Sequence, residues 1–126
     1  MDDWQTHVKR TPIIIAEHYP LSRAALSDLL LGDGYRVFQS DNARSAISCI
    51  EQNKDLSVLL ADLEMRGWKS LVQHTLAVAP NALIIAMLGS DSIVDPSELR
   101  RRGIKFWLVK PVDYEELERA IRSKGR

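Results

Sequence analysis

The stretch VLLADLEMRG, residues 58–67, carries the strongest structural signal in this chain. Its first four residues are apolar without interruption, which is typical of a strand buried on both faces of a parallel sheet. Asp62 directly follows the last of them, Ala61. Burying a carboxylate costs free energy, so a carboxylate at this place is favoured only where it has a function. In open α/β sheets, ligands bind at the carboxyl ends of the strands. The stretch therefore predicts a parallel sheet with a functional acid at one strand end.

Two other apolar runs also end in a charged residue. Residues 13–16 (IIIA) are followed by Glu17, and residues 106–109 (FWLV) are followed by Lys110. Because the carboxyl ends of parallel strands meet at one edge of a sheet, we expect Glu17, Asp62 and Lys110 to lie close together. Two acids and one lysine are suited to holding a divalent cation and a phosphoryl group.

Strands and helices are predicted to alternate along the whole chain. Apolar runs predict strands at 13–16, 35–39, 56–61, 82–88 and 106–109. Capping residues and helical periodicity predict helices at 21–31, 43–50, 68–79, 96–102 and 114–121. The first of these helices is expected to bury Ala25, Leu26, Leu29 and Leu30 on one face. Five strands that alternate with five helices imply parallel crossovers, and hence an α/β fold with a doubly wound five-stranded sheet.

Composition places the chain among ordinary globular proteins with one domain. It has 126 residues, of which 45% are hydrophobic and 27% are charged. Lys plus Arg and Asp plus Glu number 17 each, so the charge balance gives no argument for nucleic-acid or membrane binding. No apolar run approaches the roughly 20 residues that span a bilayer. We expect a flexible N-terminal extension at residues 1–11 and a single domain at residues 12–126.

The cysteine content and the first residues bear on the cellular compartment. Cys49 is the only cysteine, which excludes an intrachain disulfide and favours a reducing cytoplasm. The first four residues, MDDW, are acidic and polar, unlike the start of a signal peptide. These features lead us to expect a cytoplasmic protein that binds no membrane.

The order of these elements and the charged residues at three strand ends resemble the receiver domain of bacterial two-component response regulators. The resemblance covers about residues 12–123. It is carried by three stretches in the expected order, IIIAEH at 13–18, LADLEMRG at 60–67 and GIKFWLVKPVD at 103–113. The resemblance implies a flavodoxin-like receiver fold with strand order 2-1-3-4-5.

The same resemblance implies a phosphorylation site. Asp62 would accept a phosphoryl group from the phosphohistidine of a sensor histidine kinase or a phosphotransfer protein. Lys110 would pair with the phosphoryl oxygens. Mg²⁺ would be held by Glu17, His18, Asp62 and the backbone carbonyl of Glu64. Such a receiver is not an enzyme with a separate substrate, although it can catalyse its own phosphorylation and dephosphorylation.

The sequence departs from the family pattern in four places. His18 replaces the second acid after the first strand, so Mg²⁺ binding is expected to be weak or absent. Leu88 stands where a Ser or Thr hydroxyl would bind the phosphoryl group. The switch aromatic of the fifth strand is Trp107, which is larger than the usual Phe or Tyr. The usual Met-Pro-Gly after the acceptor reads Met65-Arg66-Gly67.

Alternatives stay open at the charged positions. Asp62 is either still phosphorylated or a remnant of such a site. Glu17 either binds metal or only forms a structural ion pair with Lys110. His18 is expected on the surface of a loop rather than as a ligand of a softer metal such as Zn²⁺, because no Cys or second His accompanies it in the motif.

Two functions of different class are expected. In the first, the chain is a phosphoryl-accepting switch that signals through the surface at residues 95–123, formed by the last two helices and the fifth strand. In the second, it is an interaction module whose output no longer depends on phosphorylation. Trp107, with Arg101, Glu115 and Arg119 around it, is the predicted centre of a contact with a partner or of a homodimer. The sequence does not identify the kinase, the pathway, an output domain or the oligomeric state.

Overall fold

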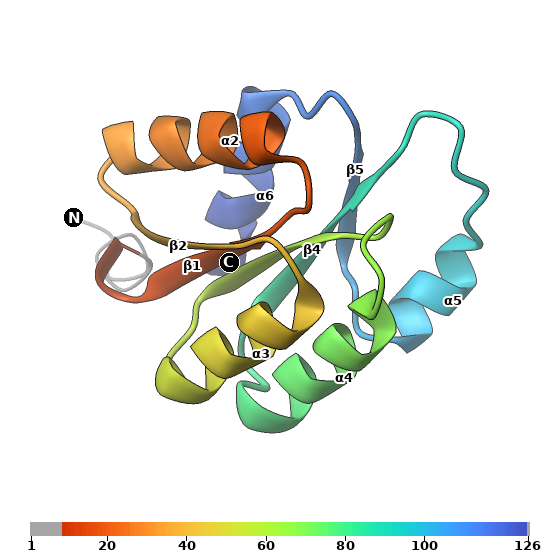
Figure 1. The fold of residues 1–126 in the computed structure, drawn as a ribbon, viewed down its shortest axis with the longest axis horizontal. Helices are drawn as coiled ribbons and strands as arrows, with labels where there is room; N and C mark the ends of the chain where they lie inside the picture. The colour runs from red at the N-terminus through yellow and green to blue at the C-terminus, as the bar shows by residue number, and fades with distance from the viewer. Residues whose placement is uncertain (1–8, 126) are drawn as a thin grey trace.

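The computed structural model describes residues 9–125 and shows a parallel sheet between two layers of helices (Figure 1). The strand order is β2-β1-β3-β4-β5, and all neighbouring strands are parallel. The strands are β1 (Pro12–Ala16), β2 (Arg36–Ser40), β3 (Val58–Asp62), β4 (Leu83–Leu88) and β5 (Phe106–Val109). The doubly wound architecture and the predicted order 2-1-3-4-5 are therefore confirmed.

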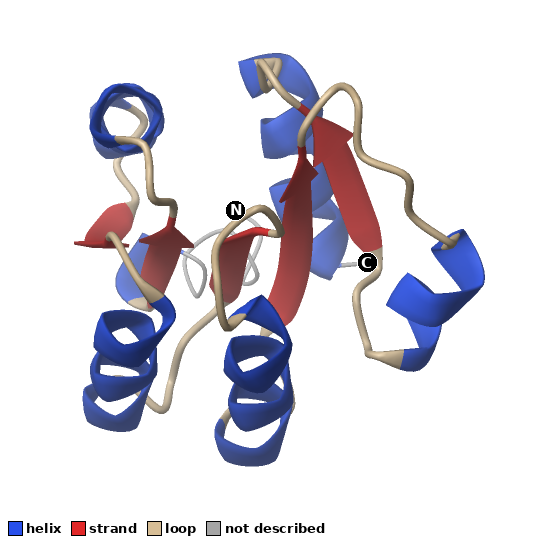
Figure 2. Cartoon of the chain, turned by 45° about the vertical axis from the view of Figure 1, so that its right-hand side comes forward, coloured by secondary structure: helices blue, strands red, loops and turns tan. Residues whose placement is uncertain are grey.

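Five α-helices within the described residues cover the two faces of the sheet. They are α2 (Pro20–Gly32), α3 (Ala43–Gln52), α4 (Trp68–Val78), α5 (Pro96–Arg101) and α6 (Tyr114–Arg122), and the 3₁₀ helix η1 (Ser123–Gly125) follows the last one. Helices α2 and α6 lie on one face, whereas α3, α4 and α5 lie on the other (Figure 1 and Figure 2). This arrangement is the one that right-handed crossovers produce.

The three central strands are buried on both faces, which explains their continuous apolar sequences. Every residue of β1, β3 and β4 is buried. Along β1, Ile13 and Ile15 pack with residues of α2 and α6, whereas Ile14 packs with residues of α3 and α4. Burial of one such side chain contributes about 2 kcal/mol. The packed central strands therefore fix the positions of the residues at the carboxyl edge of the sheet.

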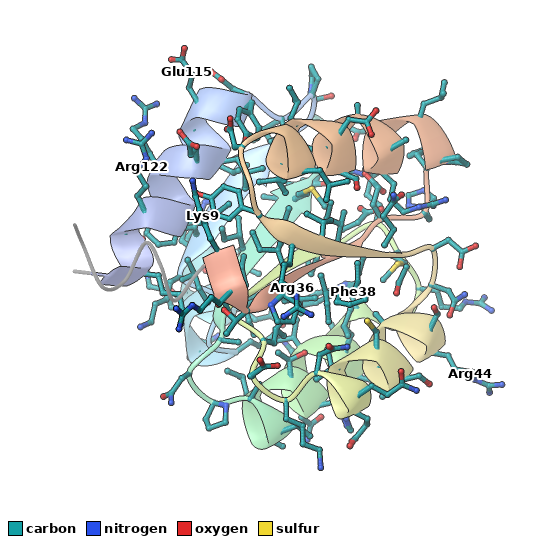
Figure 3. All side chains as sticks on the ribbon, turned by 90° about the vertical axis from the view of Figure 1, so that its left-hand side faces the viewer. Lys9, Arg36, Phe38, Arg44, Glu115 and Arg122 are labelled. Carbon is teal, nitrogen blue, oxygen red and sulfur yellow. The ribbon has the colours of Figure 1, made fainter. Side chains whose placement is uncertain are left out.

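The outer strands are only partly buried. On β2, Arg36 and Phe38 are exposed and point to the α3 side of the strand (Figure 3). On β5, Phe106 packs with the core on the α6 side and Trp107 packs with the core on the α5 side, and both are half-buried. The two aromatic side chains thus point to opposite faces, as strand alternation predicts.

Side-chain caps begin three of the helices. Asn42 precedes α3 and accepts a backbone N–H of the first helical turn at 2.7 Å. Asp95 and Asp113 do the same for α5 and α6, each at 2.9 Å. Such a cap typically contributes about 1 kcal/mol. These helices therefore begin where the local sequence predicts.

The buried face of α2 differs in part from the prediction. Leu26 and Leu30 are buried as expected, but Leu29 is 49% exposed and Ala25 is exposed as well. Ser27 is buried instead, and its hydroxyl accepts a hydrogen bond from Gln39 of β2 at 3.1 Å. The face of α2 that meets the sheet is therefore rotated toward β2, where a polar contact satisfies a polar side chain.

The predicted extension at residues 1–11 falls mostly outside the described residues, which begin at Lys9. Of the part that is described, Arg10 accepts a hydrogen bond at its carbonyl oxygen from Arg36 at 2.6 Å, and Thr11 is buried beside β1. The division of the chain at residue 12 stays a prediction. Over residues 9–125, no helix is both long and apolar enough to cross a membrane.

Candidate functional site

Three strands deliver charged side chains to one point at the carboxyl edge of the sheet. Asp62 is the last residue of β3, Glu17 follows β1, and Lys110 follows β5. The amine of Lys110 lies 2.9 Å from Oε1 of Glu17 and 3.0 Å from Oδ1 of Asp62. Both carboxylates are fully buried. The structure thus brings the three predicted residues together.

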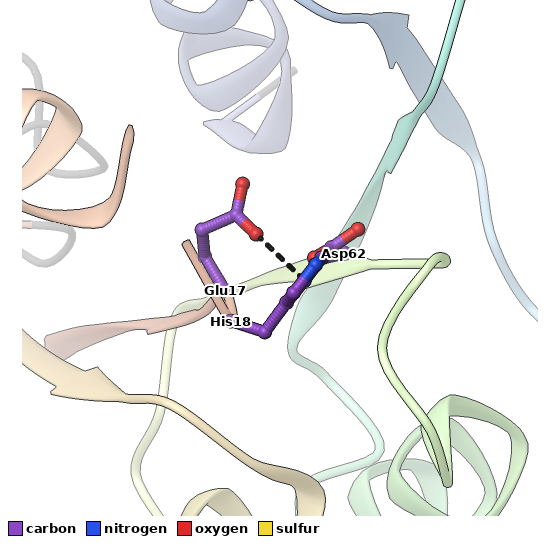
Figure 4. Close-up of side chains that lie close together, drawn as sticks. All are labelled: Glu17, His18 and Asp62. Atoms are coloured by element: carbon purple, nitrogen blue, oxygen red, sulfur yellow. Dashed lines mark hydrogen bonds and ion pairs between the residues drawn. The ribbon is translucent and has the colours of Figure 1, made fainter. Parts of the chain in front are cut away.

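His18 joins this group from the other side. Its Nδ1 hydrogen-bonds Oδ2 of Asp62 and lies 3.3 Å from Oε2 of Glu17 (Figure 4). His18 lies in the loop after β1, as expected, but its imidazole points toward the two carboxylates and its side chain is 34% exposed. Two buried carboxylates attract the imidazole N–H, and this attraction sets the direction of the side chain. We call Glu17, His18, Asp62 and Lys110 the acceptor cluster.

The two oxygens of Asp62 have different partners. Oδ1 accepts the backbone N–H of Glu64 at 2.9 Å, in addition to its ion pair with Lys110. Oδ2 is bonded to His18. The turn after β3 creates this arrangement, since the backbone N–H of Met65 bonds the carbonyl of Asp62 at 3.1 Å. Asp62 is therefore a fully buried carboxylate with every side-chain oxygen engaged.

The electrostatics of the cluster keep Asp62 ionised. Burial acts to raise its pKa, but hydrogen bonds with Glu17, the Glu64 backbone, Lys110 and His18 outweigh burial and lower the pKa of Asp62 to about 2. Burial and the neighbouring Asp62 raise the pKa of Glu17. Burial acts to lower the pKa of Lys110, but the two carboxylates raise it above its ordinary value. At neutral pH the site therefore pairs an anionic Asp62 with a cationic Lys110.

Glu64 contributes its side chain as well as its backbone. Its Oε1 lies 3.4 Å from the amine of Lys110. Its carboxylate also packs over Gly89, where an added Cβ would come within 2.9 Å of it. Sequence reasoning assigned Glu64 only a backbone carbonyl. The signal for a larger role was an acid two residues after a strand-end aspartate, close enough to reach the same lysine.

Leu88 lies at the carboxyl end of β4, the strand that pairs with β3 on one side and β5 on the other. It is the last residue of β4 and is buried, and its carbonyl accepts the backbone N–H of Lys110 at 2.8 Å. The side chain offers no hydrogen-bond donor. Position 88 therefore supplies no hydroxyl at this edge of the sheet.

The predicted interface centre is less exposed than expected. Trp107 is half-buried, and the Arg100 guanidinium lies 5.4 Å from the centroid of its ring. Arg101, Glu115 and Arg119 are exposed. Arg101 belongs to α5, on the side of β5 that Trp107 faces. Glu115 and Arg119 belong to α6, on the opposite face of the sheet. The structure therefore places only Arg101 of these three on the side of the Trp107 ring, much of which already packs inside the domain.

The cluster also holds candidate metal ligands. Glu17, His18 and Asp62 each offer one ligand atom, and these atoms lie within 4.8 Å of one another. The two carboxylate oxygens suit Mg²⁺, which prefers hard oxygen ligands in an octahedral arrangement. The imidazole nitrogen does not suit it. The donor set therefore fits Mg²⁺ only in part.

No family model matches the chain. The chain is 27% identical over 115 residues to Protein PilH of Pseudomonas aeruginosa, which covers 88% of this chain and 94% of that protein.

Solved receiver domains superpose closely on the structure. A receiver domain protein from Clostridium thermocellum has a TM-score of 0.82 at 18% identity and covers 90% of this chain and 93% of its own. A CheY-like receiver domain protein from Methanospirillum hungatei has a TM-score of 0.82 at 20% identity, with 91% and 93% covered. The signal receiver domain of a modulated diguanylate cyclase from Desulfovibrio desulfuricans has a TM-score of 0.77 at 25% identity, with 90% and 91% covered. The chain therefore folds as a response-regulator receiver domain, which confirms the resemblance seen in its sequence.

Proposed function

We propose that this chain is a phosphoryl-accepting receiver of two-component signalling and that Asp62 is the acceptor. One observation carries the proposal: an ionised, fully buried carboxylate at the edge of a parallel sheet, with a lysine amine 3.0 Å from one of its oxygens. Because burying such a pair is costly, a functional reason for keeping it is favoured over a purely structural one.

The reaction that this geometry supports is acyl phosphate formation. A carboxylate oxygen of Asp62 attacks the phosphorus of a phosphohistidine, and the new P–O bond forms as the P–N bond breaks and the imidazole leaves. Lys110 offsets the negative charge that gathers around the phosphorus. A bound divalent cation would supply further charge neutralisation, and Glu17, Asp62 and the carbonyl of Glu64 would hold it.

His18 limits access to Asp62. The oxygen that Lys110 and the Glu64 backbone leave free, Oδ2, is the one that His18 bonds. This bond must break before Oδ2 can react. The imidazole is 34% exposed and lies against the ring of Tyr19, so it must also leave that contact to turn toward solvent. We therefore expect Asp62 to be phosphorylated slowly, and replacement of His18 by Ala to accelerate the reaction.

The partners follow from the same chemistry. The phosphoryl donor is a sensor histidine kinase or a phosphotransfer protein, and the chain acts on no separate substrate. The output surface is formed by α5, β5 and α6, roughly residues 95–123, and includes Arg101, Trp107, Glu115 and Arg119. The exposed charges of this surface support a contact with another protein or with a second copy.

A second candidate function is a protein-interaction module that works without phosphorylation. Two observations favour it. The carboxylates of the acceptor cluster are already engaged from within by Lys110 and His18. Leu88 offers no hydroxyl through which a phosphoryl group could pull on the loop after β4.

Intact-mass measurement after treatment with acetyl phosphate tests the primary proposal. We expect the parent to gain the mass of one phosphoryl group, and hydroxylamine to remove it because acyl phosphates are labile to that nucleophile. Asp62→Asn should gain nothing, whereas Asp55→Asn, which changes an exposed aspartate, should behave like the parent. A parent that stays unmodified with and without divalent cations would leave only the second candidate.

A further inference from the structure

We infer that His18 makes the metal site at the sheet edge selective for a borderline transition-metal ion, such as Zn²⁺ or Co²⁺, over Mg²⁺. The inference rests on the proposed function only in placing a cation at the acceptor cluster. It starts from three ligand atoms of different hardness, an imidazole Nδ1 and two carboxylate oxygens, gathered within 4.8 Å at one point.

The carboxylates present two separate sides to their surroundings. Lys110 lies against Oε1 of Glu17 and Oδ1 of Asp62. The other two oxygens, Oε2 and Oδ2, converge on Nδ1 of His18 (Figure 4). A cation that takes the place of the imidazole proton therefore reaches all three ligand atoms without displacing Lys110.

The spacing of the ligand atoms suits a small transition-metal ion. Zn²⁺ binds nitrogen and oxygen at about 2.0–2.2 Å, which places neighbouring ligands of a tetrahedral site about 3.3 Å apart. Nδ1 of His18 and Oε2 of Glu17 are already 3.3 Å apart. The contact between His18 and Asp62 must open, through a small withdrawal of the imidazole.

The surroundings of His18 hold the imidazole in place for this role. The ring of Tyr19 lies against it with centroids 4.2 Å apart, and the backbone N–H of Tyr19 donates to Oε2 of Glu17 at 3.4 Å. The side chain of His18 is 34% exposed, which leaves an entry path and a coordination position for water. Two carboxylates, one imidazole and one water form a set that suits Zn²⁺ or Co²⁺, whereas Mg²⁺ prefers oxygen ligands alone.

Isothermal titration calorimetry of the full chain with each metal alone tests the inference. We expect Zn²⁺ and Co²⁺ to bind at least about tenfold more tightly than Mg²⁺, and His18→Gln to lose at least about tenfold in Zn²⁺ affinity. His18→Asp should reverse the preference, because it adds a hard anionic oxygen. The visible absorption of bound Co²⁺ should change in His18→Gln, since it reports the nitrogen ligand.

Two variants control for binding elsewhere. His74→Gln removes a histidine that pairs with Glu51 at 2.7 Å on another part of the surface, and it should leave Zn²⁺ affinity unchanged. His7→Gln controls for a histidine outside the described residues. Tighter Mg²⁺ than Zn²⁺ binding by the parent, or unchanged Zn²⁺ affinity in His18→Gln, would overturn the inference. Circular dichroism confirms that each variant is folded.

The test is independent of phosphorylation. Metal affinity is measured without a phosphoryl donor, and the mass measurement on Asp62 is made without Zn²⁺. A chain that binds Zn²⁺ through His18 but never accepts a phosphoryl group would refute the proposed function alone. A chain that is phosphorylated but prefers Mg²⁺ would refute the metal inference alone.

Discussion

The acceptor cluster and the pair Leu88 and Trp107 belong to the same sheet, yet they differ in chemistry. The acceptor cluster is dense in charge, with Glu17 and Asp62 paired to Lys110 within 3.0 Å. Leu88 and Trp107, the positions proposed to transmit a signal, are a buried leucine and a half-buried aromatic residue. Under the proposed function, accepting a phosphoryl group and transmitting its presence would therefore depend on different side chains.

The largest effect should come from removing the cation of the acceptor cluster. Lys110→Ala leaves Glu17 and Asp62 buried without their shared positive partner. We expect a loss of about 3 kcal/mol in the free energy of unfolding, because an uncompensated buried charge is costly. Urea unfolding followed by circular dichroism measures it.

An exposed lysine provides the matched control. Lys54 pairs with Glu51 on the surface at 3.8 Å. Lys54→Ala should change the free energy of unfolding by less than about 0.5 kcal/mol. Equal losses of unfolding free energy in the two variants would show that the buried ion network stabilises the fold no more than an exposed ion pair.

Acid should release the stabilisation that Asp62 provides. Its pKa is about 2 in the folded chain, below the ordinary value of 3.8. Its contribution is therefore complete above the ordinary value and is lost as pH falls through the folded one. We expect the stability advantage of the parent over Asp62→Asn to shrink by about 2 kcal/mol between about pH 5 and pH 2.

The pKa of Glu17 is shifted in the opposite direction to that of Asp62, so the pH dependence of stability distinguishes the two carboxylates. Its pKa is raised above the ordinary 4.5, and its contribution declines as pH rises through the folded value. Urea unfolding of the parent, Asp62→Asn and Glu17→Gln over this pH range separates the two. A parent-to-Asp62→Asn difference that is constant with pH would contradict the ion network.

Restoring a hydroxyl at the end of β4 should strengthen the switch. Leu88→Thr offers a hydrogen bond to a phosphoryl group, and such bonds to charged groups contribute about 1.5 kcal/mol. With a fluoroberyllate analogue bound, we expect amide chemical shifts across residues 95–123 to move little in the parent and more in Leu88→Thr. Nuclear magnetic resonance measures both.

Leu88→Val is the matched control, because Val has the shape of Thr without its hydroxyl. It should respond like the parent. Large shifts over residues 95–123 in the parent would show that this chain transmits the signal without a hydroxyl at position 88.

The smallest effect is expected at the output surface. We predict a homodimer or partner contact centred near Trp107 that persists without phosphorylation. Trp107→Ala should weaken it by about 1 kcal/mol or less, since part of the ring already packs inside the domain. Asp62→Asn should leave it unchanged. Sedimentation velocity of the three forms tests this prediction. A monomeric parent would contradict the homodimer, and an effect of Asp62→Asn on association would show that the contact depends on the phosphorylation site.

Local sequence signals were sufficient for the architecture. The uninterrupted apolar runs of β1, β3 and β4 predict strands buried on both faces, and the structure buries all three. Asp95 and Asp113 predict helix starts and are found as caps. Such signals act within a few residues and locate the end of each strand. Because the carboxyl ends of parallel strands share one edge of a sheet, the pattern alone placed Glu17, Asp62 and Lys110 at the same edge.

Side-chain directions depended on neighbours far along the chain. His18 turns inward because it meets Asp62, which is 44 residues away, and Ser27 is buried because it meets Gln39 of β2. Glu64 reaches Lys110 across the edge of the sheet, although the sequence suggested only its backbone. Periodicity reports which residues can share a face, but not which partner lies opposite that face. The sequence by itself therefore determined which residues lie at the carboxyl edge of the sheet. The tertiary structure decided which side chains surround Asp62, because buried charges orient toward the partners that the fold supplies.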